Sequence, residues 1–176
     1  VLALVQGILE FLPVSSSGHL ILVPALVGWD DQGLAFDIAV HFGTLLAVIA
    51  YFRRDLLEMV TSFFSPRCFE SALSWAVIWG SVPLAVMGWL MAEQVAGDLR
   101  SPMIIAVTTG VFGLLLWAAD YFTNGKRSER DLHWISAVLI GFGQALALVP
   151  GVSRSGITMT VAMALGLSRE GAARFS

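Results

Sequence analysis

Long apolar runs, separated by short polar stretches, dominate this sequence. Three of the runs reach the roughly 20 residues that a helix needs to cross the hydrocarbon core of a bilayer. These runs are Leu34–Phe52, Ser71–Met91 and Pro102–Phe122. The pattern therefore predicts an all-α, polytopic membrane protein with three transmembrane helices within residues 34–122.

Other apolar runs are short or interrupted by proline and glycine. They are Val1–Leu12 before Pro13, His19–Trp29 after Gly18, and Trp134–Val149 before Pro150 and Gly151, followed by the weakly polar Ser155–Leu167. Short and broken hydrophobic segments are typical of chains that enter a membrane and turn back. We therefore predict two re-entrant helix–loop–helix hairpins, over residues 1–33 and 134–168.

The charged residues divide the predicted loops into basic and acidic ones. Lysine and arginine in short loops mark the cytoplasmic side of a membrane protein. The basic loops carry Arg53, Arg54 and Arg67, then Lys126, Arg127 and Arg130, and the acidic loops carry Asp30 and Asp31, then Glu93 and Asp98 beside Arg100. Because the two kinds alternate along the chain, we expect three successive crossings and two hairpins that enter from opposite faces.

A short motif recurs 138 residues further along the chain. Val14–Gly18 and Val152–Gly156 agree at four of five positions, and the same offset pairs Gln6 with Gln144. This recurrence indicates an inverted repeat whose two broken tips meet near the membrane midplane. Helix N-termini and unpaired backbone N–H groups at such tips can face an anion.

The composition supports a membrane setting. Of the 176 residues, 57% are hydrophobic and 13% are charged, and the mean hydropathy is +0.79, whereas soluble domains carry about 25% charged residues. The net charge of −3 argues against nucleic-acid binding, and the single cysteine, Cys68, excludes an internal disulfide. The chain starts at Val1 rather than methionine and stops at a helix start, so we expect one membrane domain over residues 1–176, truncated at both ends.

Gln6 and Glu10 form the first candidate cluster, because residues four apart share one helix face. A carboxylate in an apolar segment is costly and usually faces a cavity or a partner. Glu10 could hold a divalent cation jointly with substrate phosphates, with Gln6 as a second metal ligand. It could instead act as a general base, or be merely solvated at the level of the lipid headgroups. The sequence leaves these three roles open.

A run of serines follows Pro13, which ends the preceding helix. The run exposes hydroxyl and amide groups on a turn, and we expect Ser15 and Ser17 to bind phosphate. His19, three residues after Ser16, could accept a proton from a serine hydroxyl or be the nucleophile itself. Our first choice is Ser16 as nucleophile with His19 as its proton acceptor, and direct attack by His19 is the second.

Arg154 dominates the second candidate cluster, since no other basic residue occurs between Arg130 and Arg169. A guanidinium within a membrane needs an anionic partner, and its planar set of donors suits phosphate. Three neighbours add further donors for phosphate: Ser153, Ser155 and Thr158. The alternative role of Arg154 is a structural ion pair with Glu10 or Asp37, and both roles can hold in an empty site.

Three segments of the chain resemble those of a known family. Gln6–His19 and Pro150–Thr158 closely resemble the two signature motifs of the undecaprenyl-diphosphate phosphatases, also called the bacitracin-resistance family. Phe36–Val48 resembles the segment that follows the first motif there. Two departures are Gln6, where some members have glutamate, and His41, where many have glutamine. The first departure puts a metal site of two carboxylates in doubt, so Glu10 would be the main metal ligand.

The resemblance implies hydrolysis of undecaprenyl diphosphate to undecaprenyl phosphate and inorganic phosphate, which recycles the lipid carrier for peptidoglycan synthesis. It implies a divalent cation, Mg²⁺ or Ca²⁺, and a multi-pass protein of the bacterial plasma (inner) membrane. The catalytic residues would be Glu10, Ser16, His19 and Arg154. The rival interpretation is a transporter or flippase of a phosphorylated polyprenyl lipid, because inverted repeats with broken helices are transporter architecture. The sequence leaves a homodimer open.

Overall fold

The computed structural model describes residues 1–64, 69–96 and 99–176. Three residues used in the sequence analysis lie outside the described residues. They are Arg67 and Asp98, which were part of the charge pattern, and the single cysteine, Cys68. Within these ranges the regular structure is helical, with one isolated parallel bridge between Arg127 and Leu167. The all-α prediction is therefore confirmed for the described part of the chain.

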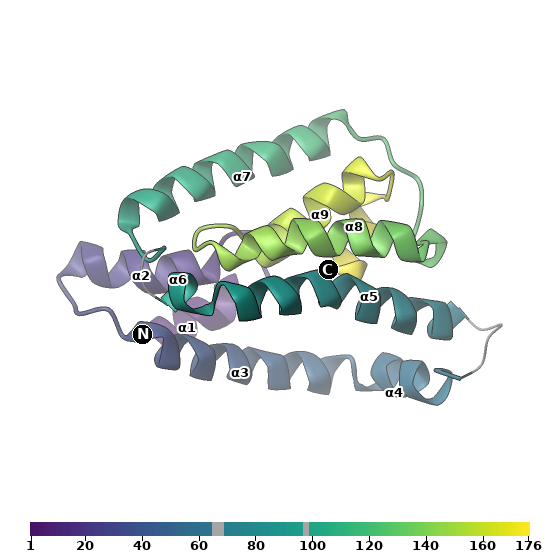
Figure 1. The fold of residues 1–176 in the computed structure, drawn as a ribbon, viewed down its shortest axis with the longest axis horizontal. Coiled ribbons are helices and arrows are strands. Elements are labelled where there is room, and N and C mark those ends of the chain that lie inside the picture. Colours follow the sequence, from purple (N-terminus) through teal and green to yellow (C-terminus); the bar gives the residue numbers. More distant parts are fainter. Residues whose placement is uncertain (65–68, 97–98) are drawn as a thin grey trace.

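The helices follow one another with short connections. In chain order they are α1 Leu2–Leu9, α2 Ser16–Val27, α3 Gly33–Tyr51, α4 Arg53–Thr61, α5 Phe69–Leu90, α6 Ala92–Ala96, α7 Pro102–Phe122, η1 Glu129–Asp131, α8 Trp134–Ala145, η2 Leu146–Leu148, α9 Arg154–Ala164 and α10 Arg169–Phe175. Figure 1 shows α3 and α4 along one side of the molecule and α7 along the opposite side, with α8 and α9 between them.

Three helices among the described residues are long and apolar enough to cross a membrane: Gly33–Tyr51, Ala72–Leu90 and Pro102–Phe122. Their bounds agree with the three predicted spans. At most 22% of the residues in each apolar window are buried inside the protein, so most of their apolar surface faces outward. Helices with so much exposed apolar surface need a hydrocarbon solvent, and the chain is a membrane protein.

Small residues let α5 and α8 approach closely, and the two helices run side by side in Figure 1. A Cβ atom added at Gly141 would lie 2.2 Å from the carbonyl oxygen of Gly80, and one added at Gly80 would lie 3.1 Å from that of Ala137. Close backbone contact through glycine and alanine is a common way for membrane helices to associate. This packing fixes α8, whose end leads to the second serine motif.

Two local predictions differ from the structure. Residues 53–61, which the charge pattern placed in a loop, form helix α4, because Leu56, Leu57 and Glu58 are good helix formers directly after the break at Phe52. The predicted apolar run from His19 begins as a helix already at Ser16, since the Ser15 side chain accepts a hydrogen bond from the Gly18 N–H and caps α2.

Candidate active site

A polar face of α1 lies against a polar face of α3. Gln6 and Glu10 are one turn apart at the end of α1, and His41 and Thr44 are one turn apart on α3. Gln6 is 1% exposed and donates from its amide nitrogen to Thr44 Oγ1 at 3.2 Å and to Glu10 Oε2 at 3.1 Å. The expectation that Glu10 faces partners rather than open solvent agrees with this geometry, since its side chain is only 16% exposed.

The Glu10 carboxylate is the centre of the cluster. Ser16 Oγ donates to its Oε2 at 2.5 Å, and His41 Nε2 lies 3.3 Å from the same oxygen. Arg154 Nη2 donates to the other oxygen, Oε1, at 2.6 Å. The carboxylate therefore binds groups that lie up to 144 positions from it in sequence.

Two serine turns bring these groups together. We call Ser15–Gly18 the first tip and Ser153–Gly156 the second tip. In each tip the leading serine caps the following helix by accepting from the glycine N–H three positions on, at 3.2 Å and 3.1 Å. In each, the two outer serine hydroxyls are hydrogen-bonded to each other, at 3.3 Å and 3.2 Å. The shared motif thus adopts a shared local structure.

The two tips touch each other. Ser155 Oγ donates to the carbonyl of Leu12 at 3.2 Å, just before the first tip. A Cβ atom at Gly18 would lie 3.4 Å from Gly151 Cα, and one at Gly156 would lie 3.4 Å from the Pro13 carbonyl oxygen. The backbones of the two segments therefore approach each other closely at both glycines.

Helix α7 supports the second tip. Thr108 Oγ1 donates to the carbonyl of Pro150 at 2.7 Å, and Thr109 Oγ1 donates to that of Gly151 at 3.1 Å. Gly151 has φ +93°, and a Cβ atom there would lie 2.1 Å from Thr108 Oγ1. Only glycine fits both the backbone conformation and the space.

The predicted pairing of Ser16 with His19 is not the contact that the structure shows. Ser16 donates to Glu10, and His19 Nδ1 donates to the backbone carbonyl of Ser15 at 2.7 Å. In the neutral ring this bond leaves Nε2 as the nitrogen with the free lone pair. His19 therefore keeps the chemistry of a base or nucleophile, and its role stays a prediction.

The predicted phosphate ligands differ in their availability. Arg154 has a 53% exposed side chain, so donors other than the one on Glu10 can reach a ligand. Thr158 is buried and donates to the carbonyl of Arg154 at 2.7 Å, which leaves its hydroxyl only as an acceptor. Ser15 is buried too, whereas Ser17, Ser153 and Ser155 are half-buried.

Asp37, which the sequence offered as a partner of Arg154, pairs elsewhere. Asp37 accepts from Arg100 Nη1 at 2.7 Å, and the same guanidinium binds Asp31 through two nitrogens at 2.7 and 2.9 Å. Arg100 holds the pKa of Asp31 below its ordinary value. Asp37 is therefore not the partner of Arg154, and His41 meets its backbone carbonyl rather than its carboxylate.

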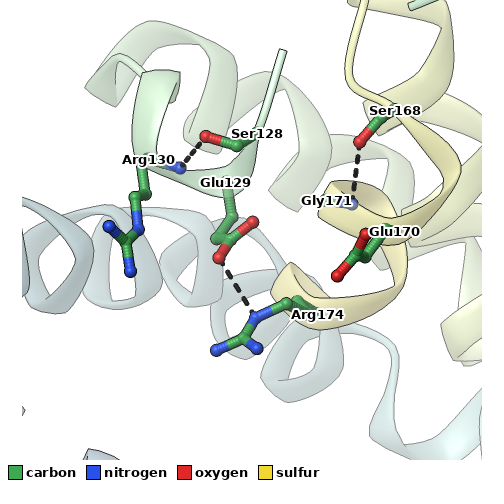
Figure 2. Close-up of a pocket in the computed structure, with 7 residues that line it drawn as sticks. All are labelled: Ser128, Glu129, Arg130, Ser168, Glu170, Gly171 and Arg174. Atoms are coloured by element: carbon green, nitrogen blue, oxygen red, sulfur yellow. Dashed lines mark hydrogen bonds and ion pairs between the residues drawn. The ribbon is translucent and has the colours of Figure 1, made fainter. Parts of the chain in front are cut away.

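One cavity of the protein lies away from this cluster. Its volume is about 270 Å³, and Figure 2 shows its lining between η1 and α10. Two of its polar contacts are internal: Arg174 pairs with Glu129 at 3.1 Å, and the Ser168 hydroxyl accepts from the Gly171 N–H at 3.1 Å. The convergence of chemical groups on Glu10, not cavity size, therefore identifies the candidate active site.

Fold and site together define a class: a helical membrane protein in which a carboxylate, a hydroxyl, an imidazole and a guanidinium meet where two broken helix pairs touch, a set of groups suited to a phosphate ligand. The family follows from comparison with known proteins. The chain belongs to the family described as bacitracin resistance protein BacA, whose family model matches residues 1–176.

Curated relatives are identical to this chain at about half of the aligned positions. Undecaprenyl-diphosphatase 2 of Stutzerimonas stutzeri (strain A1501) is 55% identical, over 100% of this chain and 68% of the relative. Undecaprenyl-diphosphatase of Nitrosococcus oceani is 53% identical, over 99% of this chain and 68% of the relative. Undecaprenyl-diphosphatase 1 of Pseudoalteromonas translucida (strain TAC 125) is 49% identical, over 100% of this chain and 68% of the relative. The resemblance found in the two serine motifs thus extends along the chain.

Proposed function

We propose that this chain hydrolyses undecaprenyl diphosphate to undecaprenyl phosphate and inorganic phosphate, and so recycles the lipid carrier for cell-wall synthesis. Its family membership and the names of its relatives support this function. The observation that carries it is the carboxylate of Glu10, bonded on one oxygen to Ser16 and on the other to Arg154. In the proposal Ser16 is the nucleophile, Glu10 its proton acceptor and Arg154 the cation that binds phosphate, and the observed contacts of Glu10 support these roles.

The proposal includes a multi-pass arrangement in the bacterial inner membrane, with α1–α2 and α8–α9 as re-entrant hairpins of an inverted repeat. Two features support it. The longest of these four helices has 12 residues, or about 18 Å at 1.5 Å per residue, which is short of the roughly 30 Å hydrocarbon core. The two tips also share a motif and a capping pattern.

In the proposed reaction, Ser16 Oγ attacks the terminal phosphorus and its proton passes to Glu10. The bond from that phosphorus to the bridging oxygen breaks, and undecaprenyl phosphate leaves. Water then attacks the phosphoserine, releases phosphate and restores the Ser16 hydroxyl. Arg154 stabilises the charge on the transferring group, the main requirement of phosphoryl transfer. Because Ser16 donates to Glu10, the geometry favours Glu10 over His19 as the first proton acceptor.

A divalent cation, Mg²⁺ or Ca²⁺, is part of the proposal. The described residues contain no group of three His, Cys, Asp or Glu side chains that could hold a metal by itself. A single carboxylate fits an ion that arrives with substrate phosphates. Gln6, which here donates to Glu10 through its amide nitrogen, would add its amide oxygen as a ligand. Glu10 and Gln6 would hold such an ion, which would neutralise phosphate charge when bound.

The transporter alternative is not favoured, because the relatives are named as diphosphatases. Phosphate release by the purified protein in detergent tests the function, since no transport between compartments can occur there. Arg154→Ala should lower kcat by about 10²- to 10³-fold. Arg169→Ala is the matched control, because Arg169 pairs with Asp120 outside the site. Near-normal turnover of Arg154→Ala would contradict the proposed role of the guanidinium.

A further inference from the structure

His41 is held by its own helix in an orientation that points at Glu10. Its Nδ1 donates to the carbonyl of Asp37, one turn earlier on α3, at 2.7 Å. That bond fixes the ring and directs Nε2 toward Glu10 Oε2, 3.3 Å away. Both ring nitrogens therefore face acceptor oxygens, one on α3 and one on α1. Both can donate at once only when the ring is the doubly protonated imidazolium, which is the form that pairs with the Glu10 carboxylate.

The neighbours of His41 hold the same two helices in register. Thr44, one turn further along α3, donates to the carbonyl of His41 at 2.9 Å and accepts from Gln6 at 3.2 Å. Gln6 in turn donates to Glu10. The ring thus belongs to a polar patch between two apolar helices, and in that patch only His41 reaches Glu10 from α3.

Glu10 needs such a support because of where it lies. It follows the last residue of α1, which has only eight residues, and its side chain has three rotatable torsions. Arg154 binds Oε1 from the second tip, and a guanidinium readily takes both oxygens of a carboxylate. A carboxylate turned fully toward Arg154 would leave the Ser16 hydroxyl without its acceptor.

We propose that His41 is a positioning residue for the hydrolysis proposed above: its Nε2–H holds Glu10 Oε2 on the side of Ser16 while Arg154 holds Oε1. In this proposal the ring does not act on the substrate or on the attacking oxygen directly. It acts through Glu10, by keeping the proton acceptor of Ser16 in place. The inference rests on the proposed function, and it adds a residue on α3 to the groups of the two tips.

A pair of amide substitutions separates the two bonds of the ring. In His41→Gln the amide nitrogen lies as many bonds from Cα as Nε2, so it can still donate to Glu10. In His41→Asn the amide nitrogen matches Nδ1, so it can reach the Asp37 carbonyl but not Glu10. We expect His41→Asn to lower kcat roughly 10- to 100-fold with KM within twofold, and His41→Gln to stay within about threefold of wild type.

His133→Asn is the control, because His133 is exposed at the start of α8 and its side chain makes no capping bond. Equal losses in His41→Asn and His41→Gln, or no loss in His41→Asn, would overturn the inference. If wild type itself releases no phosphate, the function fails. The positioning contact is still tested by the ¹⁵N resonance of His41 Nε2, which should shift in Glu10→Gln and would stay unchanged if the contact does not exist.

Discussion

The first and second tips have the same backbone design but carry different chemistry. Each is capped by its leading serine, and each pairs its two outer hydroxyls. The position between those hydroxyls differs, with Ser16 in the first tip and Arg154 in the second. Both side chains nevertheless end on the same carboxylate, that of Glu10.

This difference shows how a repeated turn can supply two functions. The turn fixes the direction of the second residue of each tip, Ser16 or Arg154. The identity of that residue decides whether the tip contributes a proposed nucleophile or a cation to the site. The supports of the tips differ as well. Helix α7 holds the second tip by hydrogen bonds to its preceding backbone carbonyls, whereas α3 holds the first tip's partner, Glu10, by side chains.

The largest expected effect tests the division of work between the tips. Ser16→Ala should lower kcat by about 10³-fold or more, because the proposed nucleophile is lost. Phosphate release by purified protein in detergent measures it. Ser81→Ala is the control and should keep kcat within about twofold, since the Ser81 hydroxyl donates to the carbonyl of Val77 within α5 and not to any group of the site. Substantial turnover by Ser16→Ala would instead favour His19 as the nucleophile.

Glycine substitutions compare how tightly the two tips are packed. Gly151→Ala should destabilise the protein by about 3 kcal/mol, because a Cβ atom would overlap Thr108 and the backbone has positive φ. Gly18→Ala should cost about 1 kcal/mol, since its nearest neighbour, Ile105 Cγ2, lies at 3.1 Å and can move. Thermal unfolding in detergent gives both values.

Gly110→Ala is the control for this series, because Gly110 lies on α7 with no atom near the added Cβ. It should be neutral or slightly stabilising. Equal destabilisation by Gly18→Ala and Gly151→Ala would mean that the strain at the second tip is not the deciding factor.

The sequence was sufficient where local physics decides the structure. The three long helices follow from the length and hydropathy of their segments, and the two tips follow from proline, glycine and serine in a short motif. Glu10 and Arg154 could be singled out because a charge within an apolar segment needs a partner. Their contact at 2.6 Å was among the alternatives that the sequence left open.

Contacts between distant segments could not be read from the sequence. His41 could be seen as four residues from Asp37, but its approach to Glu10 depends on how α1 packs on α3. The ion pairs of Arg100 with Asp31 and Asp37 join residues more than 60 positions apart. The sequence did contain one signal for this contact. His41 is a titratable side chain in an apolar span, and such a side chain needs a partner for the same reason that Glu10 does.

The caps should contribute equally if the tips share one backbone design. Ser15→Ala and Ser153→Ala each remove the acceptor for a glycine N–H at a helix start. Each should lower the free energy of unfolding by about 1 kcal/mol, measured by thermal unfolding in detergent. Replacement by threonine, which also caps helices, is the matched control and should retain most of the stability. Markedly unequal losses from the two alanine variants would show that the tips are alike only in outline.

The smallest expected effect concerns the ion pairs of Arg100, which connect the start of α7 with the start of α3. Arg100 precedes α7, which holds the second tip, and it binds Asp31 and Asp37 at the start of α3, which holds Glu10. Because Arg100 lowers the pKa of Asp31, the pair stabilises the protein at neutral pH, and this contribution is lost as the pH falls through the lowered value. Asp31→Asn should therefore cost about 0.5 kcal/mol at pH 7, since the exposed pair is screened by water. The difference in Tm between wild type and Asp31→Asn should shrink toward pH 3. A difference that stays constant with pH would locate the effect of Asp31 in its hydrogen bond to the Gly33 N–H rather than in its charge.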